Sequence, residues 1–178
     1  MTLGALPQTV EVRTLAAREV TLAGVLDPIK LLRFSAAIVA VKQPVVVNAD
    51  FYRDEEGRYI VSVQVTAEVQ VTCQRCLGTL EQTVASSALL AVVWTDEQAA
   101  QLPPRYEPLV AEAEIDFWEV VEDELLLALP SFSYHSDANC GAETGVQAPG
   151  SGDIVVPGSP DKDNPFDVLK ALKGDVDN

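Results

Sequence analysis

The chain has 178 residues, 48% of them hydrophobic and 22% charged, which excludes a disordered protein and allows one domain with a sizeable core. Twelve Lys and Arg residues against 27 Asp and Glu residues give a net charge of -15, which argues against a general nucleic-acid-binding protein, because such proteins neutralise phosphates with basic side chains. No stretch approaches the roughly 20 apolar residues of a transmembrane helix, and the N-terminus lacks the basic and apolar regions of a secretory signal.

The first part of the chain predicts short elements. Residues 10–18 fit a short helix or an irregular entry, and residues 19–26 alternate as in a strand. Asp27 and Pro28 then predict a helix start, because Asp accepts backbone N–H groups as an N-cap and Pro at the first helical position loses no hydrogen bond. We expect this helix to cover residues 28–34.

A β-hairpin is predicted next. Residues 45–51 fit a strand, residues 54–57 a turn, and residues 59–72 a long strand in which apolar and polar side chains alternate. One face of the long strand is therefore expected to be buried. The alternation resumes over residues 77–94, so residues 73–76 should form a tip between two strands.

The second half predicts one strong helix. Residues 95–102 resemble a capped helical turn, and residues 107–113 a short strand or a loop. Residues 116–129 carry apolar side chains at helical spacing, with Asp116 as a candidate N-cap. Pro130 should end this helix.

The predicted fold class is α+β, with one domain over residues 1–140 built mainly from an antiparallel β-sheet and a few helices. Gly, Pro, Ser and Asp dominate residues 141–163, which predicts a flexible linker. Residues 164–173 then predict a short amphipathic helix. Its apolar stripe consists of Phe166, Leu169 and Leu172. An isolated helix shorter than roughly 12 residues is marginal in water, so this one should dock either on its own domain or on a partner.

The acidic excess lies in the C-terminal half, since residues 81–178 contain four Lys and Arg residues against nineteen Asp and Glu residues. The predicted helix 116–129 carries Glu119, Glu122 and Asp123. These carboxylates predict either a solvated helix face or a docking face for a basic protein. Catalysis is disfavoured because no phosphate loop, nucleophile motif or dinucleotide-binding motif is present, so neither an enzyme nor a small-molecule substrate is expected.

A direct RNA contact would have to be local and would rest on basic residues of the first half. The candidates are Arg13, Arg18, Lys30 and Arg33. Ordinary solvated surface is the favoured interpretation, because no aromatic residues are interleaved with these side chains and no RNA-binding motif accompanies them.

All three cysteines and the single histidine fall into two motifs, C-x-x-C at Cys73 and Cys76 and H-x4-C at His135 and Cys140. Three thiolates and one imidazole are a ligand set for one tetrahedral zinc ion, and four protein ligands would make that site structural. The motifs can meet only if the segment after Pro130 folds back onto the hairpin tip. Two alternatives remain, namely buried cysteines without metal and a thiol redox pair, although such a pair normally precedes a helix rather than a strand. An odd cysteine count without a secretory signal predicts the reducing cytoplasm.

Six short segments carry a resemblance to a known family. They are V-T-C-Q-R-C-L at 71–77, W-T-D-E-Q-A at 94–99, Y-E-P at 106–108, V-E-D-E-L-L-L-A-L-P at 121–130, H-x4-C at 135–140 and N-P-F-x-V-L-x-x-L-K at 164–173. In this order they resemble the bacterial YceD family, the large ribosomal RNA subunit accumulation proteins. The resemblance implies a cytoplasmic factor in the synthesis, processing or stability of 23S ribosomal RNA, and it brings no catalytic residues.

The partners implied are ribosome-assembly or rRNA-processing proteins, and basic ribosomal proteins suit the acidic half of the chain. The alternative function is a thiol redox or zinc switch that uses Cys73 and Cys76.

Overall fold

The computed structural model describes residues 4–111 and 113–141 of the protein. Its strands are β1 (Gly4–Ala5), β2 (Thr9–Glu11), β3 (Thr21–Leu26), β4 (Ala40–Val41), β5 (Val45–Arg53), β6 (Tyr59–Thr72), β7 (Thr79–Val93), β8 (Glu107–Val110) and β9 (Glu114–Asp116). Its helices are α1 (Val12–Ala17), the 3-10 helix η1 (Pro28–Lys30), α2 (Leu32–Ala37), α3 (Asp96–Ala99) and α4 (Phe117–Ala128). Among the described residues, no helix is long and apolar enough to cross a membrane.

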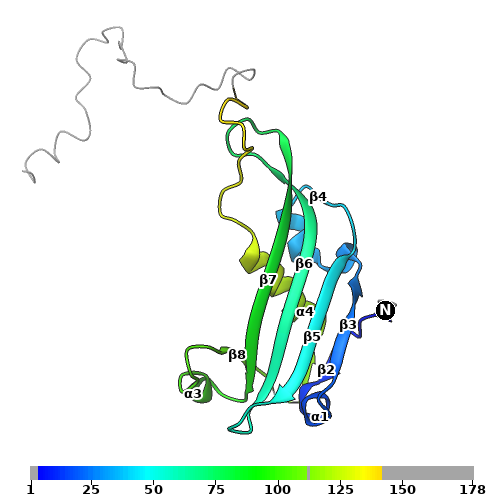
Figure 1. The fold of residues 1–178 in the computed structure, drawn as a ribbon, viewed down its shortest axis with the longest axis vertical. Coiled ribbons are helices and arrows are strands. Elements are labelled where there is room, and N and C mark those ends of the chain that lie inside the picture. Colours follow the sequence, from blue (N-terminus) through cyan, green and yellow to red (C-terminus); the bar gives the residue numbers. More distant parts are fainter. Residues whose placement is uncertain (1–3, 112, 142–178) are drawn as a thin grey trace, which may run out of the picture. The chain divides into compact units, whose positions relative to one another are not determined.

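Within this part of the chain, seven strands form one sheet in the order β1-β3-β5-β6-β7-β8, with β4 paired to β6, and β2 pairs with β9 in a second sheet (Figure 1). The outer pairs β1–β3 and β7–β8 are parallel, and the other pairs are antiparallel. The predicted α+β class with a mainly antiparallel sheet is confirmed. The predicted hairpin is β5–β6, and its turn contains Gly57 at a φ of 79°, a conformation that glycine adopts without strain.

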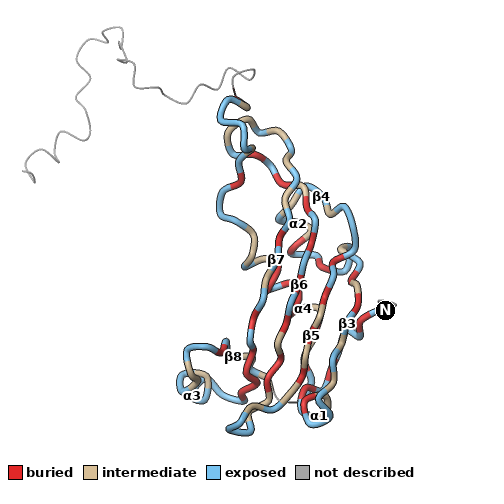
Figure 2. The backbone as a smooth tube through the Cα atoms, in the orientation of Figure 1, coloured by how far each residue is buried: buried red, intermediate tan, exposed pale blue. Residues whose placement is uncertain are grey.

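One face of the sheet is buried because apolar and polar side chains alternate along the long strands. From Val61 to Val71 on β6 every second residue is buried, and the residues between them are polar (Figure 2). α1 packs on β5 and β6, α4 packs on β6 and β7, and α2 packs against α4. These helices therefore cover the apolar face. The largest side chains of this layer are Phe34, Phe51 and Phe117, each at most 1% exposed.

A second, smaller apolar cluster lies on the opposite face, at the end of the sheet that carries the β5–β6 turn. It consists of Ile60, Ala91 and Tyr106. Tyr106 also donates a hydrogen bond from its hydroxyl to Asp54 in that turn, at 3.1 Å. The segment that contains α3 and β8 is thereby fixed to this end of the sheet.

The predicted helix over residues 28–34 is wrong at Leu31. Here η1 and α2 are separate helices, because Leu31 between them has non-helical dihedral angles and is buried at 1% exposed. A leucine side chain cannot cap α2. Instead, the carboxylate of Glu122 on α4 accepts hydrogen bonds from the first N–H groups of α2, Arg33 N at 2.7 Å and Phe34 N at 3.1 Å.

The predicted linker 141–163 lies outside the described residues except for Gly141. The predicted helix 164–173 also lies outside them. Its apolar residues are Phe166, Leu169 and Leu172. This part of the proposed domain organisation stays a prediction.

Candidate metal centre

The turn between β6 and β7 carries the C-x-x-C motif, as the strand pattern predicts. It is closed by hydrogen bonds from Cys73 N to Gly78 O at 2.8 Å and from Leu77 N to Cys73 O at 2.9 Å. Leu77 has a φ of 59°, in the left-handed region that leucine rarely adopts, so the surrounding contacts determine this backbone. Two other backbone N–H groups of this turn point at cysteine sulfurs. Arg75 N lies 3.5 Å from Cys73 Sγ, and Gly78 N lies 3.4 Å from Cys76 Sγ.

The surroundings of Cys73 favour its thiolate form. Burial by itself disfavours the charged form, but hydrogen bonds from backbone N–H groups, chiefly those of Cys76 and His135, outweigh this and lower the pKa of Cys73 to about 5. The residue is completely buried. A buried thiolate is stabilised by hydrogen-bond donors or by a cation, and a bound metal ion would supply the cation.

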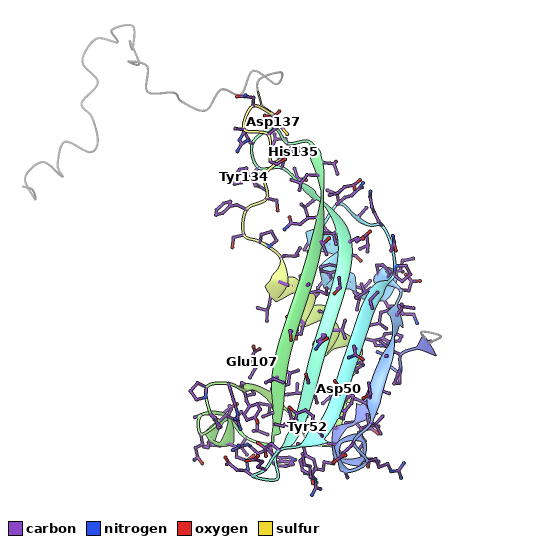
Figure 3. The ribbon with its side chains drawn as sticks, in the orientation of Figure 1. Asp50, Tyr52, Glu107, Tyr134, His135 and Asp137 are labelled. Carbon is purple, nitrogen blue, oxygen red and sulfur yellow. The ribbon has the colours of Figure 1, made fainter. Side chains whose placement is uncertain are left out.

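The segment after α4 folds back onto this turn. Gln74 N donates to Ser133 O at 2.8 Å, and the Arg75 guanidinium donates from Nη1 to Asp137 O at 2.8 Å. Figure 3 shows His135 and Asp137 beside the loop that joins β6 and β7. These hydrogen bonds bring the H-x4-C motif to the hairpin tip.

The four candidate ligand atoms gather at one point, all within 4.8 Å of one another. They belong to Cys73, Cys76, His135 and Cys140. The sulfurs of Cys73 and Cys140 are 3.9 Å apart and both cysteines are free. Two thiolates on a tetrahedral zinc ion, with Zn–S bonds of about 2.3 Å, would lie roughly 3.8 Å apart. Four such ligands fill a tetrahedral coordination sphere, so the arrangement can hold a metal ion and leaves no position for substrate.

The two ring nitrogens of His135 have different neighbours. Nδ1 lies 3.3 Å from Cys76 Sγ, and Nε2 lies 3.2 Å from Thr79 O. When Nε2–H donates to that carbonyl, Nδ1 keeps its lone pair for a metal, which is the usual arrangement of a ligating histidine. Sequence reasoning missed Thr79, because a backbone carbonyl leaves no signal in the residue type.

Arg75 is a second residue of the metal centre that the ligand motifs do not identify. Its Nη1 lies 3.6 Å from Cys140 Sγ. Three thiolates and one divalent cation leave a net charge of about -1, which a neighbouring guanidinium offsets. Burial raises the pKa of Cys140, as do the neighbouring Cys76 and Cys73, while Arg75 opposes that rise.

The predicted acidic face of α4 is divided into buried and exposed carboxylates. Glu119 and Asp123 are exposed, but Glu122 is only 7% exposed, so the expectation of a solvated side chain is wrong for it. Arg33 lies 2.8 Å from a carboxylate oxygen of Glu122, 2.8 Å from one of Asp123 and 4.0 Å from one of Glu119. Hydrogen bonds to Glu122 and then Asp123 raise the pKa of Arg33. Its charge is thus neutralised within the protein.

The candidate RNA-binding residues do not form one patch. Arg13 and Arg18 lie on or next to α1, whereas the other two candidates lie on η1 and α2, elsewhere along the sheet (Figure 2). The Lys30 ammonium is 4.1 Å from the ring centroid of Trp118, and the Arg13 guanidinium is 4.4 Å from that of Trp94. Aromatic partners are therefore present, but they come from distant parts of the chain.

Two comparisons with known proteins find the same family. Residues 61–173 match the family model described as Large ribosomal RNA subunit accumulation protein YceD. The chain is 34% identical over 170 residues to a curated protein of Haemophilus influenzae named Large ribosomal RNA subunit accumulation protein YceD, and the match covers 94% of this chain and 96% of that protein. No solved structure matches the chain.

Proposed function

The chain belongs to the YceD family of large ribosomal RNA subunit accumulation proteins, and from this membership we propose that it supports the accumulation of large-subunit ribosomal RNA. The observation that carries the proposal is the similarity to the Haemophilus influenzae protein, which extends over nearly the full length of both chains. The proposed role is that of a cytoplasmic, non-enzymatic factor acting on the synthesis, processing or stability of 23S ribosomal RNA.

The cysteine and histidine cluster is proposed to bind one structural Zn²⁺ ion. Its ligands would be Cys73, Cys76, His135 and Cys140. Three observations support this role: the mutual distances of the ligand atoms, the N–H groups directed at sulfur, and the hydrogen bond that orients the histidine. The ion would tie the segment after α4 to the hairpin tip and thereby stabilise both.

Partners are proposed to be ribosome-assembly or rRNA-processing proteins, with basic ribosomal proteins as the class that suits the net charge. On α4 the carboxylates that could meet such a partner are those of Glu119 and Asp123, because Glu122 is buried. The residues Phe166, Leu169 and Leu172 remain proposed contacts of the C-terminal segment.

Depletion of the protein in cells tests the proposed role most directly. Northern blots should show a lower ratio of 23S to 16S ribosomal RNA in a deletion strain, and the intact chain should restore the ratio. The double variant Glu119→Gln with Asp123→Asn should restore it less well than Glu55→Gln with Glu114→Gln, which removes the same charge from exposed positions elsewhere. An unchanged 23S level in the deletion strain would refute the proposal.

The alternative, a thiol switch, takes support from the lowered pKa of Cys73. Elemental analysis of the purified protein distinguishes the two roles. The structural proposal requires about one zinc per chain, lost in Cys73→Ser, Cys76→Ser, His135→Asn and Cys140→Ser but retained in the neighbouring variant Ser136→Ala. A metal-free protein that readily forms a disulfide between Cys73 and Cys76 would favour the switch.

A further inference from the structure

Two arginine guanidiniums lie beside the same aromatic ring at the end of the sheet opposite the metal centre. The Arg53 guanidinium is 4.5 Å from the ring centroid of Tyr59, and the Arg13 guanidinium is 6.0 Å from it. Arg13 also lies 4.4 Å from the ring of Trp94, which meets Tyr59 edge to face at 6.3 Å. Figure 1 shows that α1 and the β5–β6 turn lie together at this end. These four side chains form an arginine–aromatic cluster.

Neither guanidinium of the cluster has an ion-pair partner among the described residues. Within residues 4–111 and 113–141, no carboxylate lies within 4.0 Å of Arg13 or Arg53. They share this property with Arg18, Lys30, Arg75 and Arg105, and in this part of the chain only Arg33, Lys42 and Arg58 form ion pairs. Two of the three acids of the neighbouring turn are already engaged, while Glu55 is exposed. Asp54 and Glu56 both bind Arg58, at 2.7 and 2.6 Å.

Two like charges held near one another without a counterion attract an anion. Both side chains are exposed. A guanidinium that stacks on an aromatic ring keeps its in-plane N–H donors for hydrogen bonds, and their fork geometry suits phosphate. Arg53 uses one donor on the hydroxyl of Tyr59, at 2.6 Å, so others remain.

A pocket of about 310 Å³ adjoins the cluster. Tyr59 and Trp94 line it, together with Gln98, Gln101 and the acidic Glu56. The Gln98 side-chain oxygen accepts a hydrogen bond from Trp94 N at 2.9 Å, which leaves its amide N–H groups as donors. Aromatic rings stack on nucleobases of any sequence, and amides can hydrogen bond to base edges. Proteins hold single-stranded nucleic acid by combining hydrogen-bond donors that contact phosphate with aromatic rings that stack on bases.

We propose that the arginine–aromatic cluster of Arg13, Arg53, Tyr59 and Trp94 binds single-stranded RNA, with a phosphate on the guanidiniums and a base in the adjoining pocket. RNA is the ligand chosen because of the proposed role in rRNA accumulation, so the inference rests on that role. The contact is local, since the rest of the protein is acidic and would repel a longer phosphate chain.

Fluorescence anisotropy of the full chain with a short fluorescein-labelled single-stranded RNA tests this site. Two phosphate-binding arginines predict a slope of about -1.4 for the logarithm of the binding constant against that of the salt concentration. Arg13→Gln or Arg53→Gln should weaken binding at least about fivefold and reduce the slope to about -0.7. Arg13→Lys should also weaken binding, because Lys keeps the charge but loses the planar fork.

Arg18→Gln is the matched control, since it removes the same charge from an exposed residue next to α1 that makes no cation–π contact with any described aromatic ring. It should change affinity by less than about twofold. An equal loss in Arg18→Gln would overturn the proposal, and so would absence of RNA binding by the intact chain. If Arg13→Gln then loses a protein partner in pull-downs, the cluster binds protein instead.

The outcome is separable from that of the proposed function. If the intact chain restores 23S ribosomal RNA in the deletion strain and Arg13→Gln with Arg53→Gln does so equally well, the RNA site is refuted while the role in accumulation stands. If the deletion strain has normal 23S levels, the proposed function fails whatever the RNA affinity in vitro.

Discussion

Arg33 and Glu122 join helices α2 and α4, because the Glu122 carboxylate accepts both the Arg33 backbone N–H at 2.7 Å and its side-chain Nε–H at 2.8 Å. The same carboxylate accepts Phe34 N, so one side chain of α4 supplies the cap that α2 lacks in its own sequence. Glu122, which the sequence predicts on an exposed helix face, thus stabilises the fold instead.

Replacement of Glu122 by Ala should therefore destabilise the protein. Two backbone N–H groups lose their acceptor, one in a part-buried and one in a buried place, which predicts a loss of about 2 kcal/mol in the free energy of unfolding, measured by urea denaturation. Asp123→Asn is the control, because Asp123 binds the same arginine but is 52% exposed, and it should cost less than about 1 kcal/mol. Equal losses would show that the cap contributes nothing.

Gly24 on β3 should not tolerate a larger residue. A Cβ there would lie 2.3 Å from Gly4 O and 2.8 Å from Cγ of Leu6, so the pairing of β1 with β3 would have to shift. Gly24→Ala should lower the free energy of unfolding by about 1–3 kcal/mol in thermal or urea unfolding. Gly4→Ala, on the paired strand, meets no atom within 4 Å and should stay within about 0.5 kcal/mol of wild type.

Removal of zinc should loosen the hairpin tip more than the centre of the sheet. Metal binding and folding are coupled where ligands come from separate segments, so a chelator should speed amide hydrogen exchange over residues 72–80 and 131–140. Residues 60–66 of β6, which pair with both β5 and β7, should exchange as slowly as before. Hydrogen exchange with mass spectrometry measures both. Identical exchange at the tip with and without chelator would contradict a stabilising metal.

Glu124 should make stability depend on pH. Burial, only partly opposed by the hydrogen bond from Ser86 at 2.7 Å, raises its pKa. Because the pKa of Glu124 is higher in the folded state, its protonated form contributes to the free energy of unfolding. This contribution is fully present below the unfolded-state pKa of about 4.3 and is lost as pH rises through the folded-state pKa. The side chain in Glu124→Gln stays neutral at every pH. The free energy of unfolding of this variant, relative to that of wild type, should therefore increase as pH rises from 4 to 7.

The control for this pH series is Glu114→Gln, at an exposed position on β9. Its unfolding curve should follow that of wild type at every pH. A Glu124→Gln variant that gains nothing between pH 4 and 7 would show that the buried carboxylate is solvated in solution.

The local elements follow from the sequence because neighbouring residues determine them. The two-residue alternation of β6 and β7 predicts both strands and their buried face, and Asp116 caps α4 as expected, accepting hydrogen bonds from Trp118 N and Glu119 N at 3.0 Å. The position of Cys73 and Cys76 between two strands follows from the same alternation.

Contacts between layers do not leave such a pattern. The break at Leu31 depends on a carboxylate 89 positions away from Arg33, and Trp94, the nearer aromatic partner of Arg13, directly follows β7. Periodicity reports which face of an element is apolar, but not which residue of another element lies opposite it.

The sequence by itself determined the chemistry available to this protein. It supplies three thiols and one imidazole in two motifs, an acidic C-terminal half, and the alternating pattern of an antiparallel hairpin. The tertiary structure alone decided how these groups are used. It gathered the four ligand atoms within 4.8 Å, buried Glu122 as a helix cap and left Arg13 and Arg53 without a counterion among the described residues. The reason is that ligand geometry and charge neutralisation depend on distances across the packed layers, which are fixed only when the helices cover the sheet.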